Sequence, residues 1–323
     1  MAATTEITHR TVRTNGIDLH VAEAGTGKPV ILCHGFPESW YSWRHQVPAL
    51  AEAGYHVVAP DQRGYGDSDL LDQVSDYGIR PLTDDLLGLL DDIGEEKAVF
   101  VGHDWGALIV WDLAVMHPDR VEAVVGVSVP YFRPPVKPTE LFEMLSGGNF
   151  FYILYFQQVG PAEQELGADP RGTMTKVLYA ISGEALGDEP RTLQSTLPRE
   201  GTGFLTAMED QPLQRPSWLT EADLDEYVRQ FTRSGFFGPV SYYRNLDANW
   251  EITKELPPPP MPSFFIGGDR DPVLGGSTAG IDMMKDTLPD FRGHVLIQGA
   301  GHWTQQEDPE AFNRALIDFL GSL

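Results

Sequence analysis

Residues 101–107 place an acidic side chain where a buried strand would turn directly into a helix. The β-branched and aromatic run at 98–101 precedes the turn, Gly102 and Gly106 flank it, and a helical pattern follows. Such a tight strand-to-helix turn presents the residue at its apex as a nucleophile. The apex residue is Asp104. A carboxylate there can attack an sp3 carbon and form an ester with it, so the turn predicts epoxide opening or halide displacement in place of ordinary esterase chemistry.

Two later loops supply the partners that such a nucleophile needs, in the chain order of the α/β-hydrolase fold. His302 follows an apolar strand pattern near the end of the chain and lies in a glycine-rich loop, where this fold requires a base. The loop after the strand expected at 263–267 holds two acids, Asp269 and Asp271. We expect Asp271 to orient His302 and Asp269 to hold the turn, with the reverse assignment as the alternative.

Hydrolysis of an ester at Asp104 would generate an oxyanion, which needs hydrogen-bond donors. Residues 30–37 end a strand with a turn whose backbone can face the site. We therefore expect the N–H groups of Phe36 and Trp105 to form the oxyanion hole, and both residues to contact the substrate. Asp104 also begins a helix, where the helix dipole favours a carboxylate over its acid.

The elements that position these residues alternate between strand and helix patterns over the first 130 residues, as a mostly parallel sheet requires. Helical periodicity then replaces the strand signal until about residue 249. We predict an α/β-hydrolase fold with a mostly parallel sheet flanked by helices. Residues 1–132 and 250–323 would form its core, and 133–249 an inserted helical lid. The expected strands are 7–14, 18–22, 30–34, 56–60, 98–103, 121–127, 263–267 and 294–298. The expected helices include 41–54, 82–94, 105–117 and 309–320, and a lid helix from Thr220 through Phe231.

Composition limits the partners of the chain. It has 323 residues, of which 47 are acidic and 23 basic, and its formal net charge of −24 disfavours nucleic acid and anionic membrane surfaces. The single cysteine, Cys33, forbids an intrachain disulfide. No apolar run approaches the roughly 20 residues of a transmembrane helix, and the first residues lack a signal-peptide pattern. We expect a soluble cytoplasmic protein without membrane insertion, and both a monomer and a homodimer fit the sequence.

Several motifs together resemble the soluble, cytosolic-type epoxide hydrolases. They are HGFPESWYSWR at 34–44, DQRGYGDS at 61–68, the Asp104 turn and GHWTQ at 301–305. The resemblance covers nearly the whole chain, without the extra N-terminal domain of the vertebrate form. It includes the lid, where 152–163 and 238–245 look like the two tyrosine motifs of the family.

The resemblance implies that Tyr152 and Tyr243 bind the substrate and donate hydrogen bonds to the epoxide oxygen. Phenols, with a pKa of about 10, are better donors to a leaving alkoxide than water is. Their neighbours Tyr155 and Tyr242 would be packing residues. No metal and no organic cofactor is implied.

Two other functions share parts of this pattern. A haloalkane or haloacid dehalogenase uses the same aspartate nucleophile, but it needs halide-stabilising Trp or Asn side chains in place of tyrosine donors. Here Phe36, and not a polar amide, follows Gly35. A non-catalytic small-molecule-binding protein of this fold generally lacks a catalytic residue, whereas this chain keeps them all. The sequence therefore predicts an epoxide hydrolase that forms a vicinal diol through a covalent Asp104 glycol monoester, which water activated by His302 then hydrolyses.

Overall fold

The computed structural model describes residues 6–187, 193, 195–275 and 277–323. Within these residues eight strands form one sheet in the order β1-β2-β4-β3-β5-β6-β7-β8. β2 pairs antiparallel with β1 and with β4, and the other neighbouring strands are parallel, which confirms the mostly parallel sheet. The strands are β1 (Thr8–Thr14), β2 (Ile17–Ala24), β3 (Lys28–Cys33), β4 (Tyr55–Pro60), β5 (Ala98–His103), β6 (Val121–Val127), β7 (Ser263–Gly268) and β8 (Phe291–Ile297).

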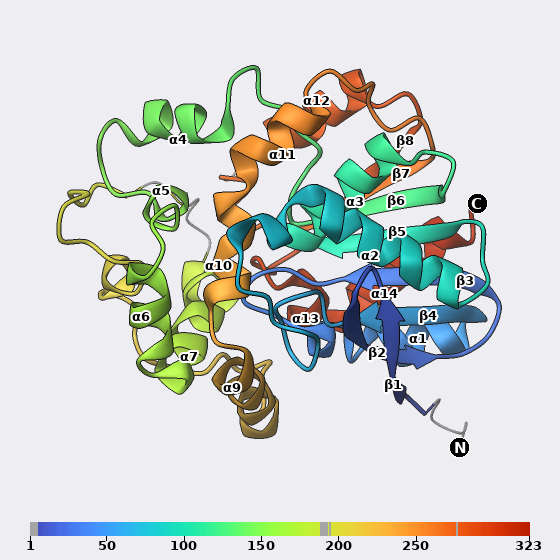
Figure 1. Ribbon diagram of the computed structural model, residues 1–323, viewed down its shortest axis with the longest axis horizontal. Helices are drawn as coiled ribbons and strands as arrows, with labels where there is room; N and C mark the ends of the chain where they lie inside the picture. The colour runs from blue at the N-terminus through green and yellow to red at the C-terminus, as the bar shows by residue number, and fades with distance from the viewer. Residues whose placement is uncertain (1–5, 188–192, 194, 276) are drawn as a thin grey trace.

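Helices cover both faces of this sheet (Figure 1). In the described part of the chain, no helix combines the length and the apolar character that crossing a membrane requires. Beside the sheet lie α1 (Gln46–Glu52), α2 (Ile79–Asp92), α3 (Trp105–Met116), α12 (Ala279–Thr287), α13 (Thr304–Glu307) and α14 (Pro309–Leu320). Between β6 and β7 come α4 (Pro138–Ser146), α5 (Tyr152–Tyr155), α6 (Pro161–Gly167), α7 (Pro170–Ala180), α8 (Gly183–Leu186), α9 (Glu221–Ser234), α10 (Phe237–Arg244) and α11 (Leu246–Thr253).

The central strands are apolar on both sides, so each face of the sheet carries its own core. On β3, Ile31 and Cys33 pack into the core under α2 and α3, whereas Val30 and Leu32 pack into the core under α1 and α14. All four side chains are fully buried. Burying one such aliphatic side chain contributes about 1.5–3 kcal/mol. Burial on both faces explains why these strands read as continuous apolar runs in the sequence.

The single helix expected over 41–54 is wrong. The structure has a 3₁₀ turn at Trp40–Trp43 and then α1, with a break between them. Pro48 explains the break, because a proline inside a helix lacks an N–H group and its ring clashes with the carbonyl four residues earlier, here that of Arg44. α1 begins at Gln46, so Pro48 falls in the first turn, where an N–H would have no helical partner.

Helices α4 to α11 lie beside the sheet, and we call them the helical layer. In Figure 1, α4 to α9 lie to the left, and α10 and α11 run between them and the sheet. α9 begins as expected, because the Thr220 hydroxyl accepts a hydrogen bond from the Asp223 N–H at 3.1 Å. Hydrogen bonds tie this layer to the rest, including one of 2.8 Å from the Tyr41 hydroxyl to Asp223. α11 crosses the boundary expected between residues 249 and 250, and the division into core and lid stays a prediction.

The turn from β5 into α3 is one residue long and strained. Asp104 has φ +52° and ψ −115°, a region that residues with a side chain rarely adopt. Two glycines permit it: a Cβ on Gly102 would lie 2.1 Å from the carbonyl oxygen of Gly106, and one on Gly106 would lie 2.1 Å from that of Cys33. Only hydrogen atoms fit where the two strands and the helix meet.

Replacing Gly106 with alanine is therefore expected to lower the free energy of unfolding by about 1–3 kcal/mol, the cost of overpacking a tight interior. Chemical denaturation of wild type and variant measures the difference. Gly167→Ala is the matched control: its Cβ would meet no atom within 4 Å, so the change should stay below about 1 kcal/mol. Equal effects of the two substitutions would contradict this account of the turn.

Candidate active site

The carboxylate of Asp104 lies at the amino end of α3 and faces the turn that follows β3. The backbone N–H of Phe36 donates a hydrogen bond of 2.7 Å to Asp104 Oδ1. This approach requires glycine at position 35, because a Cβ there would lie 2.4 Å from the Cβ of Asp104. The other oxygen, Oδ2, points toward His302. The side chain of Asp104 is 16% exposed, so it is accessible from the cavity described below.

In the structure, His302 lies between the carboxylates of Asp104 and Asp271. Its Nε2 lies 3.6 Å from Asp104 Oδ2, and its Nδ1 hydrogen-bonds Asp271, with the shorter contact 3.0 Å to Oδ2. Asp271 is fully buried and His302 nearly so. Asp269 lies elsewhere, accepting a 2.7 Å hydrogen bond from the Gly299 N–H. The geometry therefore agrees with the preference for Asp271 over Asp269.

The two carboxylates decide the protonation of His302. Burial by itself lowers the pKa of this imidazole, but the charge and hydrogen bond of Asp271 and the charge of Asp104 outweigh it and raise the pKa well above its usual value. The two neighbouring carboxylates therefore favour the protonated form of the ring. Removing the charge of Asp104 removes part of this stabilisation.

Two tyrosines face Asp104 from the helical layer. Tyr152 begins α5 and Tyr243 lies in α10, with their ring centres 5.8 Å apart. Tyr243 packs edge-on against Trp105, with ring centres 5.0 Å apart. Burial raises the pKa of both phenols, and the charge of Asp104 raises it further. Both hydroxyls are therefore protonated and able to donate.

The adjacent tyrosines use their hydroxyls elsewhere. The Tyr155 hydroxyl donates a 3.0 Å hydrogen bond to Glu165, and the Tyr242 hydroxyl donates one of 2.9 Å to the backbone carbonyl of Arg63. Each is therefore committed to the packing of the protein, as expected for residues beside the two that face the site.

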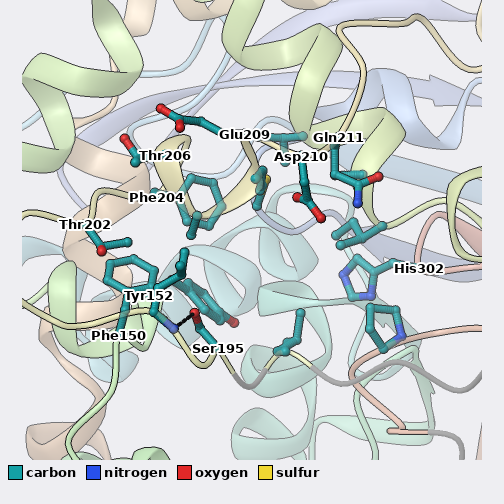
Figure 2. Close-up of a pocket in the computed structure, with 18 of the residues that line it drawn as sticks. Phe150, Tyr152, Ser195, Thr202, Phe204, Thr206, Glu209, Asp210, Gln211 and His302 are labelled. Carbon is teal, nitrogen blue, oxygen red and sulfur yellow. Dashed lines mark hydrogen bonds between the residues drawn. The ribbon is translucent and has the colours of Figure 1, made fainter.

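A cavity of about 700 Å³ joins these groups, with lining residues that include Phe36, Asp104, Tyr152, Tyr243 and His302. Figure 2 shows His302 on one side of the cavity and Tyr152 on the other. The size suits a small organic molecule. Within the described residues, no three His, Cys, Asp or Glu side chains are grouped so as to hold a metal ion. The two N–H groups expected to form the oxyanion hole differ. The Phe36 N–H donates a hydrogen bond to Asp104, whereas within the described residues the Trp105 N–H does not.

Behind the site lies a buried polar network that the sequence analysis did not identify. His103 Nδ1 lies 2.6 Å from Glu38 Oε2, and its Nε2 lies 2.7 Å from the backbone carbonyl of His302. Glu38 also accepts hydrogen bonds from the Gln305 and Gln306 side chains. A histidine directly before the nucleophile and a glutamate in the turn after β3 were the available signals.

The network contains a buried carboxylate, that of Glu38. Burial alone would raise the pKa of Glu38, but the charge and hydrogen bond of His103 lower it to about 2. Glu38 is therefore ionised and can only accept hydrogen bonds, as can the carbonyl of His302. The two ring nitrogens of His103 thus lie against two acceptors, Glu38 and the carbonyl of His302, and this contact links Glu38 to the backbone of His302.

Comparison with known proteins gives a consistent result. The family model of the α/β-hydrolase fold matches residues 28–158. Epoxide hydrolase A of Mycobacterium tuberculosis is 48% identical over 98% of both chains. The crystal structure of epoxide hydrolase A from Mycobacterium thermoresistibile is 47% identical, with a TM-score of 0.89 and 98% of both chains covered. An epoxide hydrolase from an endophytic Streptomyces is 41% identical, with a TM-score of 0.91, 98% of this chain and 95% of that chain covered.

The charge of Asp104 is expected to control the protonation of His302. In Asp104→Asn the pKa of His302 should fall below its wild-type value, because one of the two carboxylates that stabilise the imidazolium becomes neutral. A titration of the His302 ring by NMR measures it. Asp91→Asn, which neutralises a carboxylate that is 67% exposed and bound to Arg120, should leave the titration unchanged. An unaltered His302 pKa in Asp104→Asn would mean that the two groups are not coupled.

Proposed function

The chain belongs to the epoxide hydrolases of the α/β-hydrolase fold, and from that membership we propose how its own residues convert an epoxide and water into a vicinal diol. One observation carries the proposal: Asp104, His302, Tyr152 and Tyr243 line the same cavity. A nucleophile, a base and two proton donors are thus available to one bound molecule. Both steps of the reaction follow from their arrangement.

In the first step Asp104 attacks an epoxide carbon. Because Oδ1 accepts a hydrogen bond from the Phe36 N–H, Oδ2 is the oxygen that forms the new bond to carbon. The carbon–oxygen bond of the epoxide breaks, and its electron pair stays on the epoxide oxygen. Tyr152 and Tyr243 donate hydrogen bonds to that oxygen, and one of them transfers a proton to the forming alkoxide. The product is a glycol monoester of Asp104.

In the second step water hydrolyses this ester. Esterification removes the charge of Asp104, which lowers the pKa of His302. The ring gives up its proton to the tyrosinate that the first step left behind, and the neutral imidazole can then act as a base. His302, oriented by Asp271, takes a proton from a water molecule that attacks Cγ of Asp104. The oxyanion forms on Oδ1, where the Phe36 N–H already donates. When this intermediate collapses, the bond between Cγ and Oδ2 breaks. The diol leaves with Oδ2 and takes up one of the two protons of the water, the other stays on His302, and the carboxylate of Asp104 is restored. We include the Trp105 N–H as the second donor, to be recruited when the oxyanion forms.

The substrate is held by Phe36, Trp105 and the two tyrosines in this proposal. The tyrosines come from residues 133–249, which we propose to act as the lid that closes the cavity over the nucleophile. A cytoplasmic location and a solution state of monomer or homodimer stay predictions from the sequence.

Replacing His302 with glutamine should let the ester form and then persist, because its hydrolysis loses the base. Intact-mass spectrometry after mixing with styrene oxide is expected to show the mass of one substrate added to the protein, and peptide mapping should place it on Asp104. The double variant His302→Gln and Asp104→Asn is the control and should show no adduct. Diol formation by His302→Gln at the wild-type rate would contradict the proposal.

The tyrosines distinguish epoxide opening from halide displacement, because an alkoxide needs a proton and a halide ion does not. Tyr152→Phe or Tyr243→Phe alone should slow ester formation about ten- to thousandfold, the range for losing one donor to a developing oxyanion. The double variant should be almost inactive on epoxides while remaining folded. Stopped-flow measurement of ester formation gives the rates.

Tyr155→Phe provides the matched control, since its hydroxyl bonds to Glu165 and its loss should leave ester formation nearly unchanged. Release of halide from a haloalkane is measured in parallel. Ordinary diol formation by the double variant would show that Tyr152 and Tyr243 only pack the lid.

A further inference from the structure

Two stretches of backbone, one from the helical layer and one from the loop of His302, lie in direct contact. A Cβ on Gly183 would lie 2.0 Å from the carbonyl oxygen of Gly299 and 2.8 Å from the nitrogen of Gly301. In the other direction, a Cβ on Gly301 would lie 2.3 Å from the nitrogen of Gly183. No side chain fits between the two segments, so a displacement of one is felt directly by the other.

Hydrogen bonds join the same two stretches. The backbone N–H of His302 donates to the carbonyl of Ile181 at 2.9 Å, and the indole N–H of Trp303 donates to the carbonyl of Leu178 at 2.9 Å. The backbone of His302 is thus bonded to the helical layer on one side. On the other side its carbonyl accepts from His103.

The carboxylate of Glu307 hydrogen-bonds both segments, and we call this contact region the junction. Glu307, the last residue of α13, is partly buried, and its Oε2 accepts hydrogen bonds from the N–H of Gly183 at 2.8 Å and of Gly301 at 3.0 Å. Its Oε1 accepts one from the N–H of Trp303 at 3.0 Å. Glu307 therefore bonds to the residues on both sides of His302 and to the first residue of α8.

From these contacts, and resting on the function proposed above, we infer that Glu307 is a positioning residue for His302: it fixes the base against the lid segment 181–183, so that ester hydrolysis depends on where that segment lies. Glu307 does not line the cavity and acts only through the backbone. Ester formation uses Asp104 and the tyrosines, which Glu307 does not contact, so only the second step should depend on it.

The chemistry of the carboxylate makes glutamine an informative replacement. Burial raises the pKa of Glu307 to about 7, against the three backbone N–H groups that favour the ionised form. Glutamine has nearly the same size and turns one acceptor oxygen into an NH₂ group, which cannot accept from a backbone N–H. Glu307→Gln therefore removes part of the junction without leaving a cavity.

The test compares the two steps in Glu307→Gln with those of wild type, using styrene oxide in single-turnover measurements. We expect ester formation close to the wild-type rate and ester hydrolysis slowed about ten- to hundredfold, the scale of a misplacement of about 1 Å. The Asp104 ester should then accumulate and appear by intact-mass spectrometry. Gly183→Ala, which forces the two segments apart from the lid side, should have the same effect and serves if Glu307→Gln does not fold.

Glu165→Gln is the matched control. Glu165 is also partly buried and accepts hydrogen bonds from two backbone N–H groups, those of Phe204 and Leu205, at 2.9 and 3.0 Å. Its contacts lie within the helical layer, so its loss should not make the ester accumulate even if the melting temperature falls as much. Unchanged hydrolysis in Glu307→Gln, or equal accumulation in Glu165→Gln, overturns the inference. Absence of both ester and diol in the wild-type protein would instead refute the proposed function.

Discussion

The close approach of backbone segments around Asp104 is the constraint on which the rest of the structure depends. Only glycine fits at positions 35, 102 and 106, and this lets the end of β3, the end of β5 and the start of α3 meet at one point. The strained φ of Asp104 is tolerated because packing on all sides fixes it. The carboxylate then lies 2.7 Å from the Phe36 nitrogen. A flexible loop would not hold it in this position.

The charges of the site are arranged around that fixed carboxylate. Asp104 and Asp271 face the ring of His302, and Glu38 faces that of His103 on the buried side. Loss of the partner of a carboxylate as deeply buried as Glu38 strongly destabilises a protein. The pair with Asp104 differs, because the reaction itself neutralises one member. In the proposed mechanism the same histidine stabilises a carboxylate before attack and acts as a base after it.

The fold could be predicted from the sequence, and so could several residues that line the cavity, because each prediction rested on a local pattern. Strands buried on both faces give continuous apolar runs, and the glycines around Asp104 mark a turn that few other sequences can form. The sequence favoured Asp271 over Asp269 as the acid, but two carboxylates in one loop left Asp269 as an alternative. In the structure the two side chains have different partners. Asp271 hydrogen-bonds His302, and Asp269 accepts a hydrogen bond from the Gly299 N–H.

What the sequence could not provide were the roles of residues that act through the backbone. Glu307 is one acid among 47, and nothing in its neighbourhood predicts that it bonds to Gly183, which is 124 residues away along the chain. Glu38 and His103 are 65 residues apart in the same way. Such partners are brought together by the fold, and they leave no periodicity in the sequence. The break within residues 41–54 is of another kind, because its cause, Pro48, is itself present in the sequence.

The contact between residues 181–183 and the loop of His302 also bears on how proteins of this kind can diverge. A wall of a substrate cavity is usually free to change, because each new side chain alters only which molecules fit. Here one short stretch of that layer is in backbone contact with the loop of the base. Insertions and replacements that reshape the pocket would therefore be expected in other parts of the layer, such as the segment of Phe204, which also lines the cavity. New substrate ranges would arise there, while the stretch around Gly183 keeps its glycine and its length.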